Sequence, residues 1–206
     1  MIEGLYFVTD RKLSKQGILK DVKQVIGAGC KIVQYREKEK SSEEMFKEAK
    51  QLAELCKSKD VLFIVNNRVD IALAVDADGV HLGQNDLPLD LARKILGKGK
   101  IIGTSNHSVK EVKQSESAGA DYISVGPVFY TDTKKDAGPV LGLELLKQVR
   151  AITKLPIVAI GGVNEENIEE VLQAGANSVA IISAIVSTSN PGKSAERIVK
   201  KIRGFK

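Results

Sequence analysis

The strongest constraint on the fold of this sequence is a regular alternation of short apolar runs with longer amphipathic segments. Eight such pairs follow one another along 206 residues. Near-continuous apolar strands that alternate with helices are typical of a parallel sheet, whose strands are buried on both faces. The expected strands are 5–9, 32–36, 61–66, 79–82, 101–105, 122–125, 157–160 and 178–182, and the expected helices are 18–28, 43–57, 69–74, 89–96, 109–118, 143–152, 168–174 and 195–203.

Eight strand–helix units predict an α/β protein with a single (β/α)8 TIM barrel. An open doubly wound sheet is the alternative, but it requires a strand order that the sequence does not specify. Neither a linker nor a shift in composition divides the chain, so residues 1–206 are expected to form one domain.

Composition favours an ordinary globular protein, with 43% hydrophobic and 28% charged residues. Apolar runs are far shorter than the ~20 residues of a membrane span, and the first ten residues are typical of a strand rather than of a signal peptide. Cys30 and Cys56 lack metal-ligand spacing and are expected to be inert thiols. We therefore expect a cytoplasmic protein without a membrane partner.

The net charge of +5 favours small anions as ligands. Nucleic acid is not an expected partner, because aromatic residues make up only 4% of the chain and Trp is absent, which leaves little for bases to stack on. The sequence does not specify an oligomeric state.

The second expected strand runs into an unusually polar stretch. Side chains alternate between the faces of a strand, so Gln34, Arg36 and Lys38 share one face, opposite Val33, Tyr35 and Glu37. If the cationic face points inward, its two like charges require an anionic partner, and a phosphorylated ligand is the simplest one. The alternative is an exposed edge strand with a solvated polar face.

Polar and glycine-rich residues follow nearly every expected strand. In a TIM barrel the carboxyl ends of the strands form the active site. The residues in these positions are 36–38, 66–68, 83–86, 105–107, 126–127 with 131–134, 161–163 and 183–184. One site at this end of the barrel explains their distribution better than seven unrelated turns.

The last two of these loops are typical of a phosphate site. Gly161 and Gly162 allow backbone N–H groups to approach an anion, and Ser183 adds a donor at the turn into the final helix. The alternative is a tight turn that requires glycine for its backbone conformation alone.

A hard cation is a candidate ligand near Asp86 and Asn67. Mg²⁺ commonly takes one or two carboxylates together with phosphate oxygens of a substrate. Asp86 is the one carboxylate among the residues that follow the third, fourth and fifth strands, and Asn67 offers a neutral carbonyl. The alternative for Asp86 is an N-cap of the helix that begins after Pro88.

The two histidines lead to different expectations. His81 lies inside a strand and is expected to be a hydrogen-bonded core residue rather than a catalyst. His107 follows a strand end, where an acid–base role and a helix cap are both possible.

A second anion site is expected from three cations, Arg36, Lys38 and Lys134, with Asn66 and Ser105 as neutral donors. Three cations with Mg²⁺ suit a pyrophosphate better than a monophosphate, since arginine donates as a fork and lysine as a point charge. Two phosphorylated groups in one barrel favour a transferase that joins two substrates.

The sequence resembles the thiamine phosphate synthase family along nearly its whole length. The stretches that carry the resemblance are YFVTD (6–10), QYREK (34–38), NNRVDIA (66–72), DGVHLGQND (78–86), GPVF (126–129), TDTKK (131–135), AIGG (159–162) and VAIIS (179–183). Each is modest alone, but their occurrence together and in order is highly specific.

The resemblance implies a TIM barrel that joins an aminopyrimidine methyl diphosphate to a thiazole phosphate, which is often carboxylated, and releases pyrophosphate. The pyrophosphate leaves first, and the thiazole nitrogen captures a pyrimidine carbocation. Carried over by position, the pyrimidine diphosphate would be held by Gln34, Tyr35, Arg36, Glu37, Lys38, Asn66, Ser105 and Lys134, of which Arg36, Lys38, Ser105 and Lys134 are the catalytic candidates. Asn67 and Asp86 would hold Mg²⁺, and the thiazole phosphate would be held by Thr131, Asp132, Thr133, Gly162, Ile182 and Ser183.

One departure from the family pattern keeps two alternatives open. The family usually has Asp where this chain has Asn67, which predicts weaker Mg²⁺ binding. Thiazole tautomerases, which have the same barrel, lose this Asp and use a histidine near the position of His107. They do not need Arg36, Lys38, Asp86 and Lys134, all of which this chain keeps. A noncatalytic barrel that binds thiazole phosphate is the other alternative.

Overall fold

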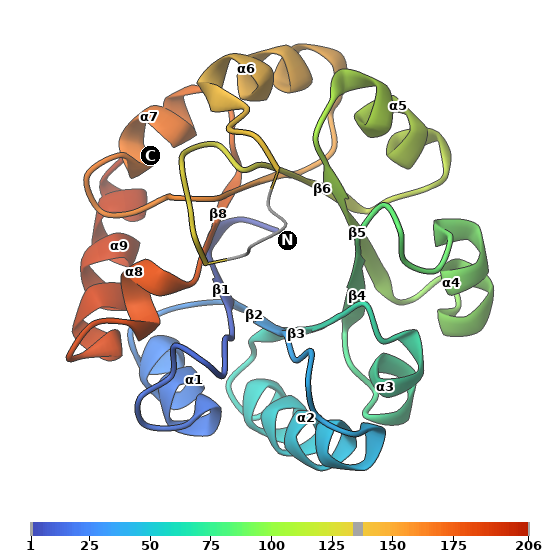
Figure 1. Ribbon diagram of the computed structural model, residues 1–206, viewed down its shortest axis with the longest axis vertical. Coiled ribbons are helices and arrows are strands. Elements are labelled where there is room, and N and C mark those ends of the chain that lie inside the picture. The colour runs from blue at the N-terminus through green and yellow to red at the C-terminus, as the bar shows by residue number, and fades with distance from the viewer. Residues whose placement is uncertain (1, 134–137, 206) are drawn as a thin grey trace.

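The computed structural model describes residues 2–133 and 138–205, and its strands close into a parallel barrel in the order β1 to β8 (Figure 1). The TIM barrel expected from the sequence is therefore confirmed. Lys134 lies outside the described residues. The strands are β1 Gly4–Val8, β2 Ile32–Tyr35, β3 Leu62–Asn66, β4 Gly79–Leu82, β5 Ile101–Asn106, β6 Tyr122–Val125, β7 Ile157–Ile160 and β8 Ser178–Ile181.

The helices surround the barrel as an outer ring (Figure 1). They are α1 Ile18–Gly27, α2 Ser42–Lys57, α3 Val69–Ala74, α4 Leu89–Leu96, α5 Val109–Ser117, α6 Gly142–Ile152, α7 Ile168–Gln173, α8 Ser183–Val186 and α9 Pro191–Phe205. Among the described residues, none of them is long and apolar enough to cross a membrane.

Two differences from the expected helices occur near the carboxyl terminus. The one-turn helix α8 was not expected, and α9 begins at Pro191, four residues before the predicted start. Asn190 explains the early start, because its side chain accepts a hydrogen bond from Lys193 N at 3.0 Å, while Pro191 occupies the first helical position, which needs no N–H.

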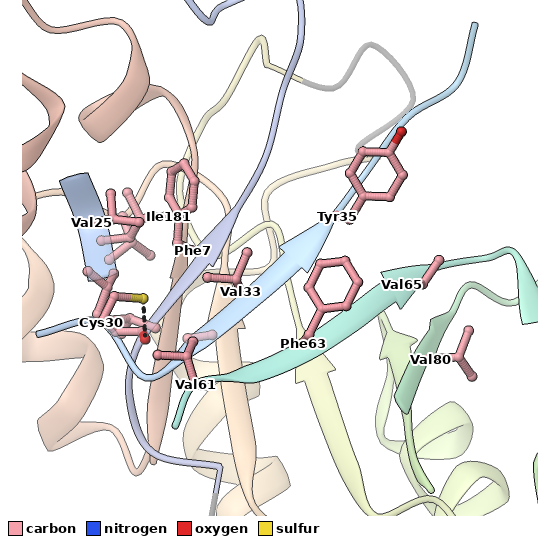
Figure 2. Close-up of a cluster of buried hydrophobic side chains, with 14 of the residues drawn as sticks. Phe7, Val25, Cys30, Val33, Tyr35, Val61, Phe63, Val65, Val80 and Ile181 are labelled. Carbon is pink, nitrogen blue, oxygen red and sulfur yellow. Dashed lines mark hydrogen bonds between the residues drawn. The ribbon is translucent and has the colours of Figure 1, made fainter. Parts of the chain in front are cut away.

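Side-chain alternation along the strands separates two apolar clusters. Phe7, Val33, Phe63 and Val80 point outward and pack with the helices in the larger cluster (Figure 2). Residues at the intervening strand positions point inward. Together with Ile2, which precedes β1, they form the smaller cluster of Ile2, Tyr6, Val8, Ile32, Ile64, Tyr122, Val158 and Ala180. This second cluster fills the barrel below its carboxyl end and forms the floor on which a site can be built.

The turns that precede β4, β6 and β8 each contain a short polar side chain that bonds to the neighbouring strand. Asp78 Oδ2 accepts a hydrogen bond from Phe63 N at 2.7 Å, and Asp121 Oδ2 accepts one from Ile102 N at the same distance. Asn177 Oδ1 accepts from Ile157 N at 2.9 Å. Since each residue directly precedes one strand and bonds to the strand before it in the chain, these short polar side chains stabilise the closure of the barrel at its amino end.

Candidate active site

A cavity of about 590 Å³ lies at the carboxyl end of the barrel. The predicted site residues that line it are Gln34, Arg36, Lys38, Asn66, Asn67, Asp86, Ser105, His107, Thr131, Thr133, Gly161, Gly162, Ile182 and Ser183. These residues come from every strand end after β1, so closure of the barrel brings together groups that are far apart in the sequence. The structure thus assembles most of the predicted set around one cavity.

A second hollow, of about 890 Å³, opens on the opposite side, around the amino ends of β1 and β3. It is larger, but its polar lining is a mixture of Lys, Arg, Asp and Glu side chains from the helix ends. The smaller cavity is the better candidate because it combines convergent polar groups with an apolar floor, as binding sites in this fold do.

The end of β2 presents its polar side chains as the alternation predicts. Gln34, Arg36 and Lys38 line the cavity, whereas Tyr35 packs in the outer cluster (Figure 2). The Tyr35 hydroxyl donates to Glu48 Oε2 at 2.8 Å. Burial, followed by the neighbouring Glu48 carboxylate, raises the pKa of Tyr35. Three predicted residues, Tyr35, Glu37 and Asp132, are not among those that line the cavity.

Arg36 is held in place by a carboxylate that the sequence analysis did not select as a site residue. Its Nη1 lies 3.2 Å from Asp10 Oδ2, and the two side chains are only 20% and 9% exposed. Asp10 is itself fixed, because its Oδ1 accepts hydrogen bonds from Lys12 N at 3.0 Å and Leu13 N at 3.1 Å. The Arg36 guanidinium is therefore already oriented at the cavity. Because its side chain is ordered in advance, ligand binding costs it little further conformational freedom.

Asn67 and Asp86 meet at the rim of the cavity. Asn67 has a backbone φ of 61°, and its Nδ2 donates to Asp86 Oδ1 at 2.8 Å. Asp86 Oδ2 accepts from Gly83 N at 2.6 Å. The cap alternative for Asp86 is wrong, because the helix α4 has Pro88 at its N-cap and no side-chain cap.

This pair fits Mg²⁺ only as part of a larger ligand set. One carboxylate and one amide lie in contact, and no group of three or more His, Cys, Asp or Glu side chains suited to a metal occurs among residues 2–133 and 138–205. Mg²⁺ often binds through one or two carboxylates and completes its shell with waters and substrate phosphates. The donor set therefore suits a metal that arrives with a diphosphate.

The floor of the cavity holds a hydrogen-bonded group that the sequence analysis missed. Tyr6 and Tyr122 join their hydroxyls at 2.8 Å, and His81 bonds to Tyr122 through Nδ1 and to Ser105 through Nε2, both at 2.9 Å. His81 is a buried, hydrogen-bonded core residue as expected, but it also lines the cavity. The sequence contained one signal for this group. Each of its residues lies an even number of positions before a polar residue at the end of the same strand, so the two side chains share the inward face.

Burial determines the ionisation of these phenols. Desolvation, the largest influence in each case, raises the pKa of Tyr6 and the pKa of Tyr122 above the ordinary value for tyrosine. Both hydroxyls therefore keep their protons at neutral pH and act as hydrogen-bond donors as well as acceptors.

Gly161 and Gly162 follow β7 with positive φ angles of 98° and 64°. A Cβ at Gly162 would lie 2.5 Å from the carbonyl oxygen of Tyr130, and one at Gly161 would lie 2.5 Å from Pro127 Cα. The turn thus requires glycine for its conformation and for close contact with the β6–α6 loop. Ser183 begins α8 on the adjacent strand end and lines the same part of the cavity.

His107 lies at the rim and is already engaged with its own helix. Its backbone N donates to Glu111 Oε2 at 2.6 Å, and its Nδ1 lies 3.3 Å from the same atom. Glu111 N in turn donates to Ser108 Oγ at 3.2 Å. The N-cap of α5 is therefore Ser108, and His107, the residue before it, is held against the first turn of the helix by Glu111.

Comparison with known proteins agrees with this geometry. A family model described as thiamine monophosphate synthase matches residues 5–185. The chain belongs to this family. The thiamine-phosphate synthase of Methanosarcina barkeri is 49% identical over 198 residues, which cover 96% of this chain and 90% of that protein. The enzyme of Persephonella marina is 46% identical over 203 residues, which cover 98% and 97%.

A solved structure supports the same assignment. The thiamine phosphate pyrophosphorylase of Pyrococcus furiosus superposes with a TM-score of 0.91 at 39% identity, covering 98% of this chain and 96% of that one. The family expected from the sequence is confirmed, together with its thiamine-phosphate synthase function and its class of enzyme, a transferase.

Proposed function

We propose that this chain joins 4-amino-2-methyl-5-(diphosphooxymethyl)pyrimidine to a thiazole phosphate, with or without a carboxylate, and releases pyrophosphate. The observation that carries the proposal is that cationic side chains and a glycine-rich turn line one cavity. Arg36 and Lys38 lie at the end formed by β2, and Gly162 and Ser183 lie at the end formed by β7 and β8. Two anionic groups can therefore be held at separate strand ends around the same cavity, because β1 lies between β2 and β8.

The end proposed for the whole pyrimidine diphosphate, its ring and its diphosphate together, is lined by Gln34, Arg36, Lys38, Asn66 and Ser105. Lys134 is assigned to it from the family resemblance alone. The bond between the pyrimidine methylene carbon and the diphosphate oxygen breaks, and its electron pair leaves with the oxygen. Positive charge at this position stabilises the transition state because charge develops on the departing group. Arg36 is suited to this role because Asp10 keeps it in place before the substrate arrives.

Mg²⁺, when bound, would supply further positive charge to the departing pyrophosphate. Asp86 and Asn67 are the residues that would hold it. Tyr35, Glu37 and Asp132 remain predicted contacts from the resemblance, but their positions outside the cavity lining make them weaker candidates than their neighbours.

The thiazole end would bind its phosphate through Gly162, Ile182 and Ser183, with Thr131 and Thr133 from the loop after β6. The positive φ angles of Gly161 and Gly162 let backbone groups approach an anion that a side chain would obstruct. The thiazole nitrogen then donates its lone pair to the methylene carbon, and a carboxylate on the ring, where present, leaves as CO2.

The cytoplasm is the proposed location. Cys30 and Cys56 are both free and buried, which suits a reducing compartment. The proposed partners are the two phosphorylated small molecules.

The experiment mixes purified protein with the pyrimidine diphosphate and the thiazole phosphate, with and without Mg²⁺, and follows thiamine phosphate by mass spectrometry. Mg²⁺-dependent product supports the proposal. Isomerisation of the carboxythiazole phosphate without condensation would indicate a tautomerase, and binding without turnover would indicate a noncatalytic barrel.

A matched pair of lysine variants tests the assignment of the diphosphate end. Lys38 lines the cavity, whereas Lys40 pairs with Glu48 at 2.8 Å outside it. We expect Lys38→Ala to reduce kcat/KM for the diphosphate by at least tenfold and to leave the affinity for thiazole phosphate nearly unchanged. Lys40→Ala should change neither, and equal losses in both variants would contradict the assignment.

A further inference from the structure

We propose that a chain of oriented hydrogen bonds through the barrel core selects a 4-aminopyrimidine over its 4-oxo analogue. This inference rests on the proposed function, because it concerns the ring that the cavity accepts. It makes Tyr6, Tyr122 and His81 positioning residues, which act on the ligand through two residues at the cavity. The members of the chain, in spatial order, are Asn66, Gln34, Tyr6, Tyr122, His81 and Ser105.

The chain is continuous and largely closed to water. Asn66 Nδ2 donates to Gln34 Oε1 at 3.1 Å, and Gln34 Nε2 donates to the hydroxyl of Tyr6 at 2.8 Å. The bonds from Tyr6 to Tyr122, from Tyr122 to His81 and from His81 to Ser105 complete it at 2.8, 2.9 and 2.9 Å. The four inner residues are between 0% and 7% exposed, so water does not replace a bond that is lost.

The direction of every bond follows from the first two. The Tyr6 oxygen accepts from Gln34, and the buried hydrogen of Tyr6 then requires an acceptor of its own, for which the oxygen of Tyr122 is in place. Tyr122 must then donate to His81 Nδ1, which therefore carries no hydrogen. A neutral imidazole in this state carries its hydrogen on Nε2 and donates it to Ser105 Oγ.

The two ends consequently offer opposite hydrogen-bonding groups to the cavity. The oxygen of Ser105 receives the bond from His81, so its own hydrogen is the one directed at a ligand. Asn66 uses its amide nitrogen toward Gln34 and offers its carbonyl oxygen as an acceptor. Both residues line the cavity.

Reversal of this pattern requires a concerted change. The amides of Gln34 and Asn66 would both have to rotate by half a turn, and each hydrogen in between would have to exchange sides. A partial reversal leaves two donors or two acceptors facing each other in the buried core, where an unmade hydrogen bond is most costly. The elevated pKa values of the two phenols keep both of their hydrogens in place.

The resulting pattern distinguishes two closely related rings. A 4-aminopyrimidine has an amino donor beside an unprotonated ring nitrogen, which suits one protein acceptor and one protein donor. In the 4-oxo analogue these positions are exchanged, because the oxygen accepts and the adjacent nitrogen carries a hydrogen. A site that is oriented by buried bonds rejects the exchanged pattern more strongly than a site of freely rotating groups.

The first experiment measures binding without turnover. The probes are the monophosphates of 5-hydroxymethyl-2-methylpyrimidine in the 4-amino and 4-oxo forms, with dissociation constants from calorimetry. We expect the wild-type protein to prefer the amino probe by at least tenfold. Tyr122→Phe, which keeps the ring and removes the hydroxyl, should reduce the preference to less than threefold, mainly by weakening the amino probe.

Ser178→Ala is the control. It also removes a buried hydroxyl from a barrel strand, but that hydroxyl donates to the carbonyl oxygen of Gly4 at the amino end of the barrel, and Ser178 does not line the cavity. It should leave the preference unchanged. Tyr6→Phe carries the same expectation as Tyr122→Phe and replaces it if that variant does not fold.

The second experiment reads the tautomer of His81 by 15N NMR. The chain has two histidines, so a His107→Gln variant identifies the signals of His81. We expect hydrogen on Nε2 in the wild type and in Ser178→Ala, and a mixture of tautomers in Tyr122→Phe. A purely structural role of Tyr122 would lower stability without moving this population.

Hydrogen on His81 Nδ1 in the wild type would overturn the inference, as would an unchanged preference in Tyr122→Phe or an equal loss in Ser178→Ala. Equal binding of both probes by a protein that forms thiamine phosphate would overturn this inference alone. Failure of the wild type to bind either probe or to form product would instead overturn the proposed function. The inference would then also lose the pyrimidine ligand on which it depends.

Discussion

Replacement of Gly103 by alanine tests whether Tyr122 is locked in the barrel core. Gly103 and Tyr122 are paired in register on β5 and β6, and both point inward. A Cβ at Gly103 would lie 1.9 Å from Cζ of the Tyr122 ring and 2.2 Å from its Cε1. The ring is fully buried, and its hydroxyl is bonded to both Tyr6 and His81, so it cannot move aside without breaking those bonds.

The expected cost follows from these contacts. Insertion of one methyl group into a packed core typically costs about 1–3 kcal/mol. The loss of the two buried hydrogen bonds of Tyr122 adds about 0.5–1.5 kcal/mol each. We therefore expect Gly103→Ala to reduce the free energy of unfolding by roughly 4 kcal/mol, which lowers Tm by roughly 8–16 °C in a chain of this size.

Urea denaturation followed by circular dichroism measures this change, with Gly27→Ala as the control. Gly27 ends the helix α1, and a Cβ there would contact nothing within 4 Å, so alanine should be neutral or slightly stabilising. In a Tyr122→Ala background, Gly103→Ala should cost about 1 kcal/mol or less, since the clashing ring is gone. A loss below about 1 kcal/mol in the otherwise unchanged protein would refute the reasoning.

Three further predictions concern the metal pair, the thiols and a helix cap. Asn67→Asp places two carboxylates in contact, so we expect a lower Tm in EDTA, a larger rise in Tm with Mg²⁺ and a lower Mg²⁺ concentration for half-maximal rate; an unchanged Mg²⁺ requirement would exclude Asn67 as a ligand. Burial raises the pKa of Cys30 to about 11 and the pKa of Cys56 to about 12, so both should react with Ellman's reagent at pH 8 only after unfolding in urea, and rapid labelling of the native protein would contradict their burial. Ser41→Ala removes the side-chain half of the capping box with Glu44 and should lower the free energy of unfolding by about 1 kcal/mol in urea titrations, whereas Ser58→Ala at the other end of α2 should change it by less than about 0.5 kcal/mol.

The secondary structure was predictable because its signals are local. The residues of β4, α3 and α4 match their expected ranges at both ends, since apolar periodicity and turn residues determine them within a few positions. The helix α8 was missed because a single turn is too short for such periodicity. The start of α9 was missed although Asn190 and Pro191 form an N-cap signal that the sequence contains.

The candidate site was predictable where the side chain follows directly from strand alternation. Gln34, Arg36 and Lys38 line the cavity for this reason. The role of Asp10 was not visible, because its contact with Arg36 joins two loops that are 26 residues apart. The cap alternative for Asp86 was plausible on local grounds and failed because Gly83 and Asn67 use both of its oxygens.

The sequence by itself determined the eightfold alternation, the faces of the strands and the family, because each depends on patterns within a single segment or on their order. Only the tertiary structure decided which inward residues meet. Tyr6 and Tyr122 are 116 residues apart and come into contact because the barrel closes, and His81 reaches Ser105 because β4 and β5 are neighbours. Hydrogen bonds between distant strands leave no periodic signal in the chain, so the oriented core beneath the cavity exists only in the folded protein.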